Sequence, residues 1–286
     1  MDTESMKNIP EQQQEWPGHT AGMDPQPDHG ETSYTGRDRL VGKKALITGG
    51  DSGIGRATAI AFAKEGADVA IVYLPQEQQD AEETRNQVQQ AGRTCVLIAA
   101  DLRTEDACRQ VAEEAINGLG SLDVLINNAG FQMAQDSLTD ISEEQLHRTF
   151  ATNVFPLFLL TKALLPHLKE GSSVINCTSI QAFEPSETLL DYASTKAAIN
   201  NATVNLAAEL GPQGIRVNAV APGPIWTPLQ PATQPPKKVE GFGSGTPLGR
   251  AGQPIEVATA FVYLASDEAS YVSGTVLGVT GGKPVF

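Results

Sequence analysis

Short apolar runs alternate with longer stretches in which apolar residues recur about every 3.6 positions, the period of an α-helix. Seven runs are expected to be strands: Ala45–Thr48, Asp68–Tyr73, Thr94–Ala99, Val124–Asn127, Val174–Cys177, Arg216–Val220 and Val276–Val279. The periodic stretches predict helices: Arg56–Glu65, Ala81–Gln90, Ala107–Asn117, Glu143–Leu168, Tyr192–Leu210 and Ile255–Leu264. Apolar strands that alternate with amphipathic helices indicate a parallel sheet covered on both faces. The pattern therefore predicts an α/β protein with one doubly wound, seven-stranded parallel sheet.

Two segments depart from this alternation. Residues 1–40 are polar and rich in proline and glutamine, so they cannot form a core of their own. We expect an extended or disordered N-terminal arm there, with Trp16, Tyr34 and Leu40 as its anchors, followed by a catalytic domain over residues 41–286. The Pro228–Arg250 stretch is rich in proline and glycine and shows no sustained period, and a loop of that length is usually functional, often a lid.

The composition excludes several classes of protein. A formal charge of −14 argues against nucleic acid and anionic membranes as partners, because both need clustered Lys and Arg. The chain has no uninterrupted run of about 18 apolar residues, so no membrane-spanning helix is expected. The polar N-terminus lacks the pattern of a secretory signal. Together these features predict a cytoplasmic protein. The three cysteines are scattered and expected to be reduced: Cys95, Cys108 and Cys177. The four histidines lack the spacing of metal ligands: His19, His29, His147 and His167.

A glycine-rich loop joins the first expected strand to the first expected helix. Gly49 permits the tight turn, Gly53 lets the backbone approach a pyrophosphate, and Gly55 lets the helix pack closely on the strand. The helix N-terminus then offers free N–H groups and a partial positive charge to the phosphates. A structural strand–helix turn is the alternative. The position of the loop favours a Rossmann-type dinucleotide site formed by Gly49, Asp51, Ser52, Gly53, Ile54 and Gly55.

The residues after the next strands should hold the adenosine half of the cofactor. The second strand ends at Tyr73-Leu74, without the acidic or basic residue that usually separates NAD from NADP. Asp51 would repel a 2′-phosphate, so the sequence favours NAD slightly over NADP. Asp101 and Leu102 are expected at the adenine edge, although Asp101 could instead cap the next helix. Small residues after the fourth strand would let the cofactor lie against the backbone: Asn128, Ala129 and Gly130.

A catalytic group is expected around Tyr192, Lys196 and Ser179. Tyr192 and Lys196 are four residues apart and share one face of a helix. A phenol has a pKa near 10, and a neighbouring ammonium lowers it. Ser179 follows a strand and can hydrogen-bond a substrate oxygen as charge develops on it. Tyr-x3-Lys alone is common on solvated helices, but its combination with Ser179 and the glycine loop is specific.

From about Leu40 to Gly282 the chain resembles the short-chain dehydrogenase/reductase family. The matching motifs occur in the family's order and cover the whole domain: TGGDSGIG (48–55), NNAG (127–130), Asn153, Ser179, YASTK (192–196) and APGPIWT (221–227). The resemblance implies that Asn153 binds a water through its backbone and so connects Lys196 to bulk solvent, and that Lys196 also hydrogen-bonds the nicotinamide ribose. It implies a substrate-facing Gln181 beside Ser179 and Tyr192, a homotetramer, and contacts to the nicotinamide carboxamide from Pro222, Gly223, Ile225 and Thr227.

Three motifs narrow the resemblance to bacterial general-stress, glucose/ribitol dehydrogenase and aldehyde reductase-like members: the N-terminal WPG, GGDSGIGRA and APGPIWTPL. The expected function is therefore hydride transfer between NAD or NADP and a carbonyl or alcohol: an aldehyde, sugar or polyol. One alternative is a 3-oxoacyl thioester reductase, for which Lys237 and Lys238 would have to receive an acidic carrier. Another is a non-catalytic dinucleotide-binding sensor or scaffold. A double-bond reductase of the family would usually space Tyr and Lys more widely.

Overall fold

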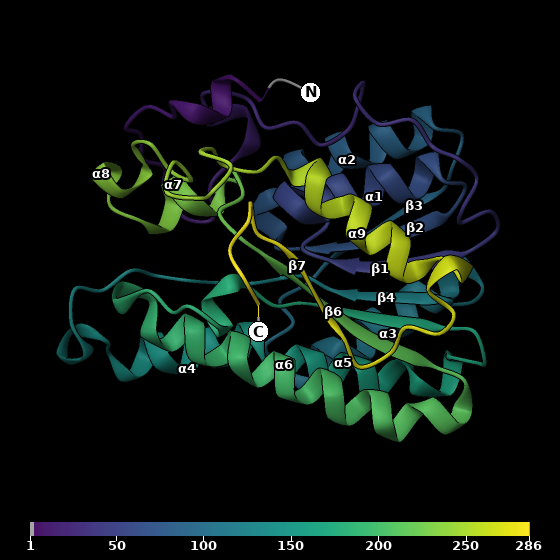
Figure 1. Ribbon diagram of the computed structural model, residues 1–286. Coiled ribbons are helices and arrows are strands. Elements are labelled where there is room, and N and C mark those ends of the chain that lie inside the picture. Colours follow the sequence, from purple (N-terminus) through teal and green to yellow (C-terminus); the bar gives the residue numbers. More distant parts are fainter. Residues whose placement is uncertain (1–2, 286) are drawn as a thin grey trace.

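The centre of the molecule is a seven-stranded parallel sheet with the strand order β3-β2-β1-β4-β5-β6-β7 (Figure 1). The computed structural model describes residues 3–285. The strands are β1 (Lys44–Thr48), β2 (Asp68–Tyr73), β3 (Cys95–Ala99), β4 (Val124–Asn127), β5 (Ser173–Cys177), β6 (Arg216–Pro222) and β7 (Val276–Val279). The order reverses between β1 and β4, where a parallel sheet opens a crevice at its carboxyl edge. The predicted seven-stranded, doubly wound architecture is confirmed.

Helices cover both faces of the sheet (Figure 1). One face carries α1 (Gly53–Lys64), α2 (Gln78–Gln90) and α9 (Pro254–Ala265). The opposite face carries α3 (Glu105–Leu119), α4 (Glu143–Asn153), α5 (Phe155–Leu164) and α6 (Leu190–Leu210). Each layer buries its apolar side chains against the sheet in a separate core, with Phe62 and Phe261 in one and Leu125 and Leu160 in the other. The strands are apolar throughout because both of their faces are covered.

The predicted helix Glu143–Leu168 is two helices, α4 and α5, separated at Val154. Pro156 lies in the first turn of α5, where its missing N–H costs nothing; in the middle of one continuous helix it would break the ladder. By length and composition the run Glu143–His167 could cross a membrane. However, the run is divided between α4 and α5, Leu157 and Leu160 are buried, and α5 packs against α3, so the run packs on the folded domain. Polar residues interrupt the apolar pattern in α4, so the run is not uniformly apolar.

The N-terminal segment lies along the domain and not away from it (Figure 1). Met6, Ile9 and Met23 are buried in a small cluster with Trp226 and the segment that follows it. The Trp226 indole donates to the backbone oxygen of Pro25 at 2.7 Å. Of the three expected anchors, Leu40 is fully buried in the main core, whereas Trp16 and Tyr34 are half-buried.

The Pro228–Arg250 segment contains two short helices that its composition did not predict. These are α7 (Leu229–Thr233) and α8 (Pro236–Val239). Val239 packs in the same cluster as the N-terminal methionines. The segment is therefore held by tertiary contacts, which no local periodicity records.

Candidate active site

A cleft of about 290 Å³ opens at the carboxyl ends of the strands. Its walls come from the loops after β1 to β6 and from α6 and α7, which are far apart in sequence. It gathers nearly all the residues predicted for the site: Gly49, Asp51, Ser52, Gly53, Ile54, Tyr73, Leu74, Asp101, Leu102, Asn128, Ala129, Gly130, Ser179, Gln181, Tyr192, Lys196, Pro222, Gly223, Ile225 and Thr227. Gly55 and Asn153 lie outside the wall.

The glycine loop is shaped for close approach. A Cβ at Gly55 would lie 1.8 Å from the carbonyl oxygen of Gly49, so only glycine lets the helix start so close to β1. Gly49 and Gly53 have φ of +64° and +48°, in the left-handed region that favours glycine. Ser52, the residue before α1, makes no side-chain capping bond. The N–H groups that begin α1 are therefore free to bind an anion, which fits a dinucleotide pyrophosphate.

Two carboxyl groups line the cleft near the end of β2. Asp51 is buried, and its Oδ2 has no hydrogen-bond partner among the described residues. Burial raises the pKa of Asp51 to about 6. Glu77 accepts a hydrogen bond from the Leu74 N–H at 3.0 Å. Burial, and then the nearby Asp51, raise the pKa of Glu77 to about 8. The sequence prediction did not include Glu77; its place four residues after β2 was the available signal.

Asp101 faces the cleft and is paired with a neighbour. Its carboxylate forms an ion pair with Arg103 at 2.6 Å, and the hydrogen bonds from Arg103 hold the pKa of Asp101 below its usual value. The side chain of Thr104 caps α3 by accepting from the Ala107 N–H. The alternative role of Asp101 as the cap of α3 is therefore wrong.

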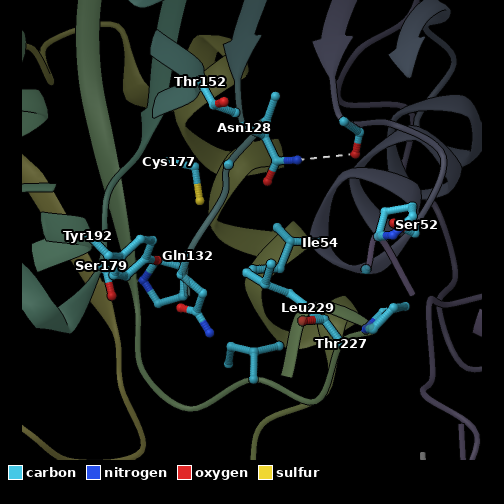
Figure 2. Close-up of a pocket in the computed structure, with 18 of the residues that line it drawn as sticks. Ser52, Ile54, Asn128, Gln132, Thr152, Cys177, Ser179, Tyr192, Thr227 and Leu229 are labelled. Atoms are coloured by element: carbon cyan, nitrogen blue, oxygen red, sulfur yellow. Dashed lines mark hydrogen bonds between the residues drawn. The ribbon is translucent and has the colours of Figure 1, made fainter. Parts of the chain in front are cut away.

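Ser179, Tyr192 and Lys196 converge on one side of the cleft. Figure 2 shows Ser179 and Tyr192 side by side, opposite Ser52 of the glycine loop. Ser179 follows β5, while Tyr192 and Lys196 lie one turn apart on α6 with Nζ of Lys196 5.4 Å from the centre of the phenol ring. The same Nζ donates to the carbonyl oxygen of Cys177 at 2.8 Å. That bond fixes Nζ beside the phenol ring in the wall of the cleft.

The protonation of this group differs from the expectation. Burial raises the pKa of the Tyr192 phenol well above its usual value, while a hydrogen bond with Ser179 opposes the rise. Burial lowers the pKa of Lys196. Desolvation of the phenol, and not the proximity of Lys196, therefore sets the direction of the pKa shift of Tyr192. Tyr192 is therefore protonated at neutral pH, the state that a proton donor requires.

Asn153 acts through its side chain on the loop after β4. Its Oδ1 accepts from the Phe131 N–H at 2.7 Å, and its Nδ2 donates to the Phe131 carbonyl at 2.8 Å and to Thr195 at 3.0 Å. A separate cavity of about 10 Å³, close to the size of one water, is lined by Asn153 and by Asn127. The buried Oδ1 of Asn127 has no protein partner among the described residues.

Several cleft residues were missed from the sequence. Trp16 and Pro17 come from the N-terminal segment, and Leu229, Gln230 and Gln234 come from α7 and the turn after it. Neither segment carries a periodic signal, so only the folded chain shows that they reach the site. Among the described residues, no cluster of three or more His, Cys, Asp or Glu could hold a metal ion.

A doubly wound sheet with a glycine loop, an open helix N-terminus and a buried Tyr–Lys–Ser group defines a dinucleotide-dependent oxidoreductase. Comparison with known proteins identifies the family. Residues 49–283 match the family model described as enoyl-(acyl carrier protein) reductase. General stress protein 39 of Bacillus subtilis is 53% identical over 97% of both chains. The glucose and ribitol dehydrogenase of Daucus carota is 46% identical over 96% of this chain and 97% of its own.

Solved structures agree. A short-chain dehydrogenase from Burkholderia cenocepacia, in complex with NADP, aligns with a TM-score of 0.78 and 33% identity over 85% of this chain and 98% of its own. A 3-ketoacyl-(acyl-carrier-protein) reductase from Brucella melitensis, complexed with NADH, aligns with a TM-score of 0.78 and 33% identity over 86% of this chain and all of its own (100%). The chain belongs to the short-chain dehydrogenase/reductase family. It is an NAD(P)-dependent oxidoreductase that acts on the CH–OH or C=O group of small molecules.

Proposed function

We propose that this enzyme interconverts a carbonyl compound and the corresponding alcohol, with Tyr192 as the acid and base. The proposed substrate is an aldehyde, a sugar or a polyol. The convergence of Ser179, Tyr192 and Lys196 opposite the glycine loop carries the proposal. The name of the Daucus carota relative supports a sugar or polyol as substrate. The four-residue spacing of Tyr192 and Lys196 favours carbonyl chemistry over the double-bond reduction that the description of the family model names.

In the proposed mechanism, Ser179 and Tyr192 hold the substrate oxygen by hydrogen bonds. Bound nicotinamide supplies the hydride, or accepts it in the reverse direction. In reduction, the protonated phenol of Tyr192 gives its proton to the oxygen as negative charge develops there. Lys196, fixed by the Cys177 carbonyl, stabilises the resulting phenolate.

Proton return to Tyr192 is proposed to pass by Lys196 and the small cavity next to Asn153. That cavity has the volume of about one water. The unpartnered Oδ1 of Asn127 supports a water there, because a buried amide oxygen without a hydrogen bond is costly. Asn153 keeps the loop after β4 in position through Phe131.

For the cofactor, we propose a preference for NAD over NADP. Asp51 and Glu77 both line the cleft near the end of β2, where the adenosine ribose is expected. A carboxylate accepts hydrogen bonds from ribose hydroxyls but repels a 2′-phosphate. The solved relatives are found with either cofactor, so this preference depends on the residues of this chain.

The assembly is proposed to be a cytoplasmic homotetramer. Large apolar side chains are exposed on neighbouring helices of one face: Leu146, Phe155, Phe158 and Val204. Such a patch is typical of an interface between subunits. The three cysteines are free, as expected of a reducing compartment.

Replacement of Tyr192 by Phe tests the mechanism. We expect Tyr192→Phe to lower kcat at least about 1,000-fold in an NADH-linked reduction of an aldehyde and sugar panel, because the proton donor is lost while the ring remains. Cofactor affinity, measured by NADH fluorescence, should change less than about threefold. Tyr263→Phe on α9, away from the cleft, is the matched control. Unchanged turnover in Tyr192→Phe would exclude Tyr192 as the acid.

A further inference from the structure

Residues 12–24 of the N-terminal segment form a closed loop, which we call the strap. Its neck is held by the Gln12 side chain, which donates to the Asp24 carbonyl oxygen at 2.5 Å and accepts from the Asp24 N–H at 3.2 Å. The strap lies beside α7 and α8 at the carboxyl edge of the sheet (Figure 1). Trp16 and Pro17, at its tip, form part of the wall of the cleft.

The tip of the strap is docked on the loop after β4 and on α4. The Trp16 ring meets Phe131 edge to face, with centroids 5.9 Å apart and an angle of 74° between the planes. Arg148 of α4 lies over both rings, with its Cζ 4.3 Å from the Trp16 centroid and 4.1 Å from that of Phe131. Burial lowers the pKa of Arg148, but an arginine remains charged at neutral pH. The contact is therefore a cation between two aromatic faces.

Two further contacts fix the strap on the other elements of the cleft. The Gln14 N–H donates to the Pro231 carbonyl of α7 at 2.9 Å. A Cβ at Gly18 would lie 2.8 Å from the Pro228 carbonyl, and φ is +83° there, so glycine is needed for this close approach. The strap thus bridges α4 and α7, and both helices contribute residues to the cleft wall.

The strap also reaches the elements beside the glycine loop. The Thr20 N–H donates to Asp80 of α2 at 3.4 Å. Asp80 is held by Arg56 of α1 at 2.9 Å, and Arg56 also donates to the backbone oxygen of Asp51 in the glycine loop. Displacement of the strap would therefore disturb contacts that lead directly to the pyrophosphate-binding turn.

We propose that Trp16 and Pro17 are cofactor-binding residues and that the strap closes over the bound dinucleotide, so that Trp16 must undock from Phe131 and Arg148 before the cofactor leaves. This inference rests on the proposed function, because it needs a dinucleotide in the cleft. The chemistry fits: an indole and a proline ring give a flat apolar wall of the kind that covers a nucleotide ring or ribose. Release of the cofactor is then a gated step, as in enzymes whose lids limit product release.

Stopped-flow displacement of NADH or NADPH from the full-length enzyme tests this proposal. We expect Trp16→Ala to raise koff about tenfold, equivalent to about 1.4 kcal/mol, and to weaken Kd about fivefold. Arg148 belongs neither to the strap nor to the cleft wall, so Arg148→Gln changes only what holds the strap in place. This substitution removes the cation–π contact with Trp16 and should also raise koff. Gln13→Ala, an exposed position on the same loop, is the matched control and should leave koff unchanged.

The outcomes separate this proposal from the proposed function. Suppose that the wild-type enzyme binds and turns over cofactor, and that Trp16→Ala has the wild-type circular dichroism and melting temperature. If this variant then releases the cofactor at the wild-type rate, the proposed closure by the strap is wrong, and the proposed function is unaffected. If wild-type protein binds neither cofactor, the proposed function fails first. If Trp16→Ala does not fold, an unchanged koff in Arg148→Gln overturns the proposal. A truncation is a poorer test, since Met6, Ile9 and Met23 belong to the folded core.

Discussion

The carboxyl groups of Asp51 and Glu77 share one end of the cleft, and their protonation should decide how strongly a 2′-phosphate is rejected. Asp51 is fully buried and Glu77 partly so. Asp80 adds negative charge nearby and raises the pKa of both groups, while Arg56 lowers that of Asp51. Both pKa values lie above the ordinary range of a carboxyl group. Each group therefore gains its negative charge only as pH rises through about 6 for Asp51 and about 8 for Glu77.

The proposed preference for NADH over NADPH should therefore increase with pH. We expect the ratio of the two Kd values to rise about tenfold between about pH 6 and about pH 9, because ionised carboxylates repel the extra phosphate. Glu77→Gln should flatten this dependence, while Glu83→Gln, on the exposed face of α2, should not. Fluorescence titrations with each cofactor provide the measurement. A ratio that stays constant with pH in wild-type enzyme would exclude these carboxyls as the discriminating groups.

At the scale of elements, the end of α1 anchors the chain that leads from the N-terminal segment into β1. The Glu65 side chain is fully buried and accepts from the N–H groups of Arg37 and Arg39, from the Arg39 guanidinium and from the Tyr34 hydroxyl. These bonds outweigh its desolvation and hold the pKa of Glu65 at about 2. The Glu65 carboxylate thus connects the N-terminal segment to the end of α1.

We expect Glu65→Gln to lower Tm by about 5 °C, because the charge-assisted bonds lost are worth about 2 kcal/mol in total. In the wild type this contribution is present above the unfolded pKa of about 4.5 and is lost as pH falls through about 2. Calorimetry at neutral pH measures the change. Asp267→Asn is the control, because it removes an ion pair between Lys43 and the Asp267 carboxylate, which is 90% exposed. This substitution should leave Tm within about 1 °C of the wild-type value. An equal loss in both variants would contradict a special role for Glu65.

For the whole molecule, the exposed apolar side chains of α5 and α6 are the surface on which the proposed tetramer can be tested. Phe155 and Phe158 are about half exposed on α5, and Val204 is exposed on α6. A net charge of −14 favours separate molecules, so an apolar contact in the proposed tetramer would have to overcome repulsion between copies.

We expect Phe158→Glu to reduce the mass measured by light scattering from that of a tetramer to that of a smaller species, since a buried unpaired charge disfavours the interface. Val41→Glu, an exposed position in the turn before β1, is the control and should retain the wild-type mass. A monomeric wild-type protein, or a Phe158→Glu protein of unchanged mass, would exclude this face as the interface.

The local sequence alone determined the sheet, its strands to within two residues, and the site residues that follow strand ends. Continuous apolar strands have only one stable arrangement, between two helical layers. The ends of parallel strands must meet at one edge of the sheet, so the sequence suffices to bring Gly49, Asp101, Asn128 and Ser179 together. The Tyr192–Lys196 pair needed only the helical repeat.

Tertiary structure alone decided the rest. Nothing in the local pattern shows that Trp16 crosses to Phe131 and Arg148, because those contacts join positions more than 100 residues apart. Burial in the folded chain is the largest cause of the raised pKa values of Tyr192 and Glu77. Periodicity records which face of an element is covered; which distant segment covers it, and how dry a side chain becomes, depends on the packing of the complete chain.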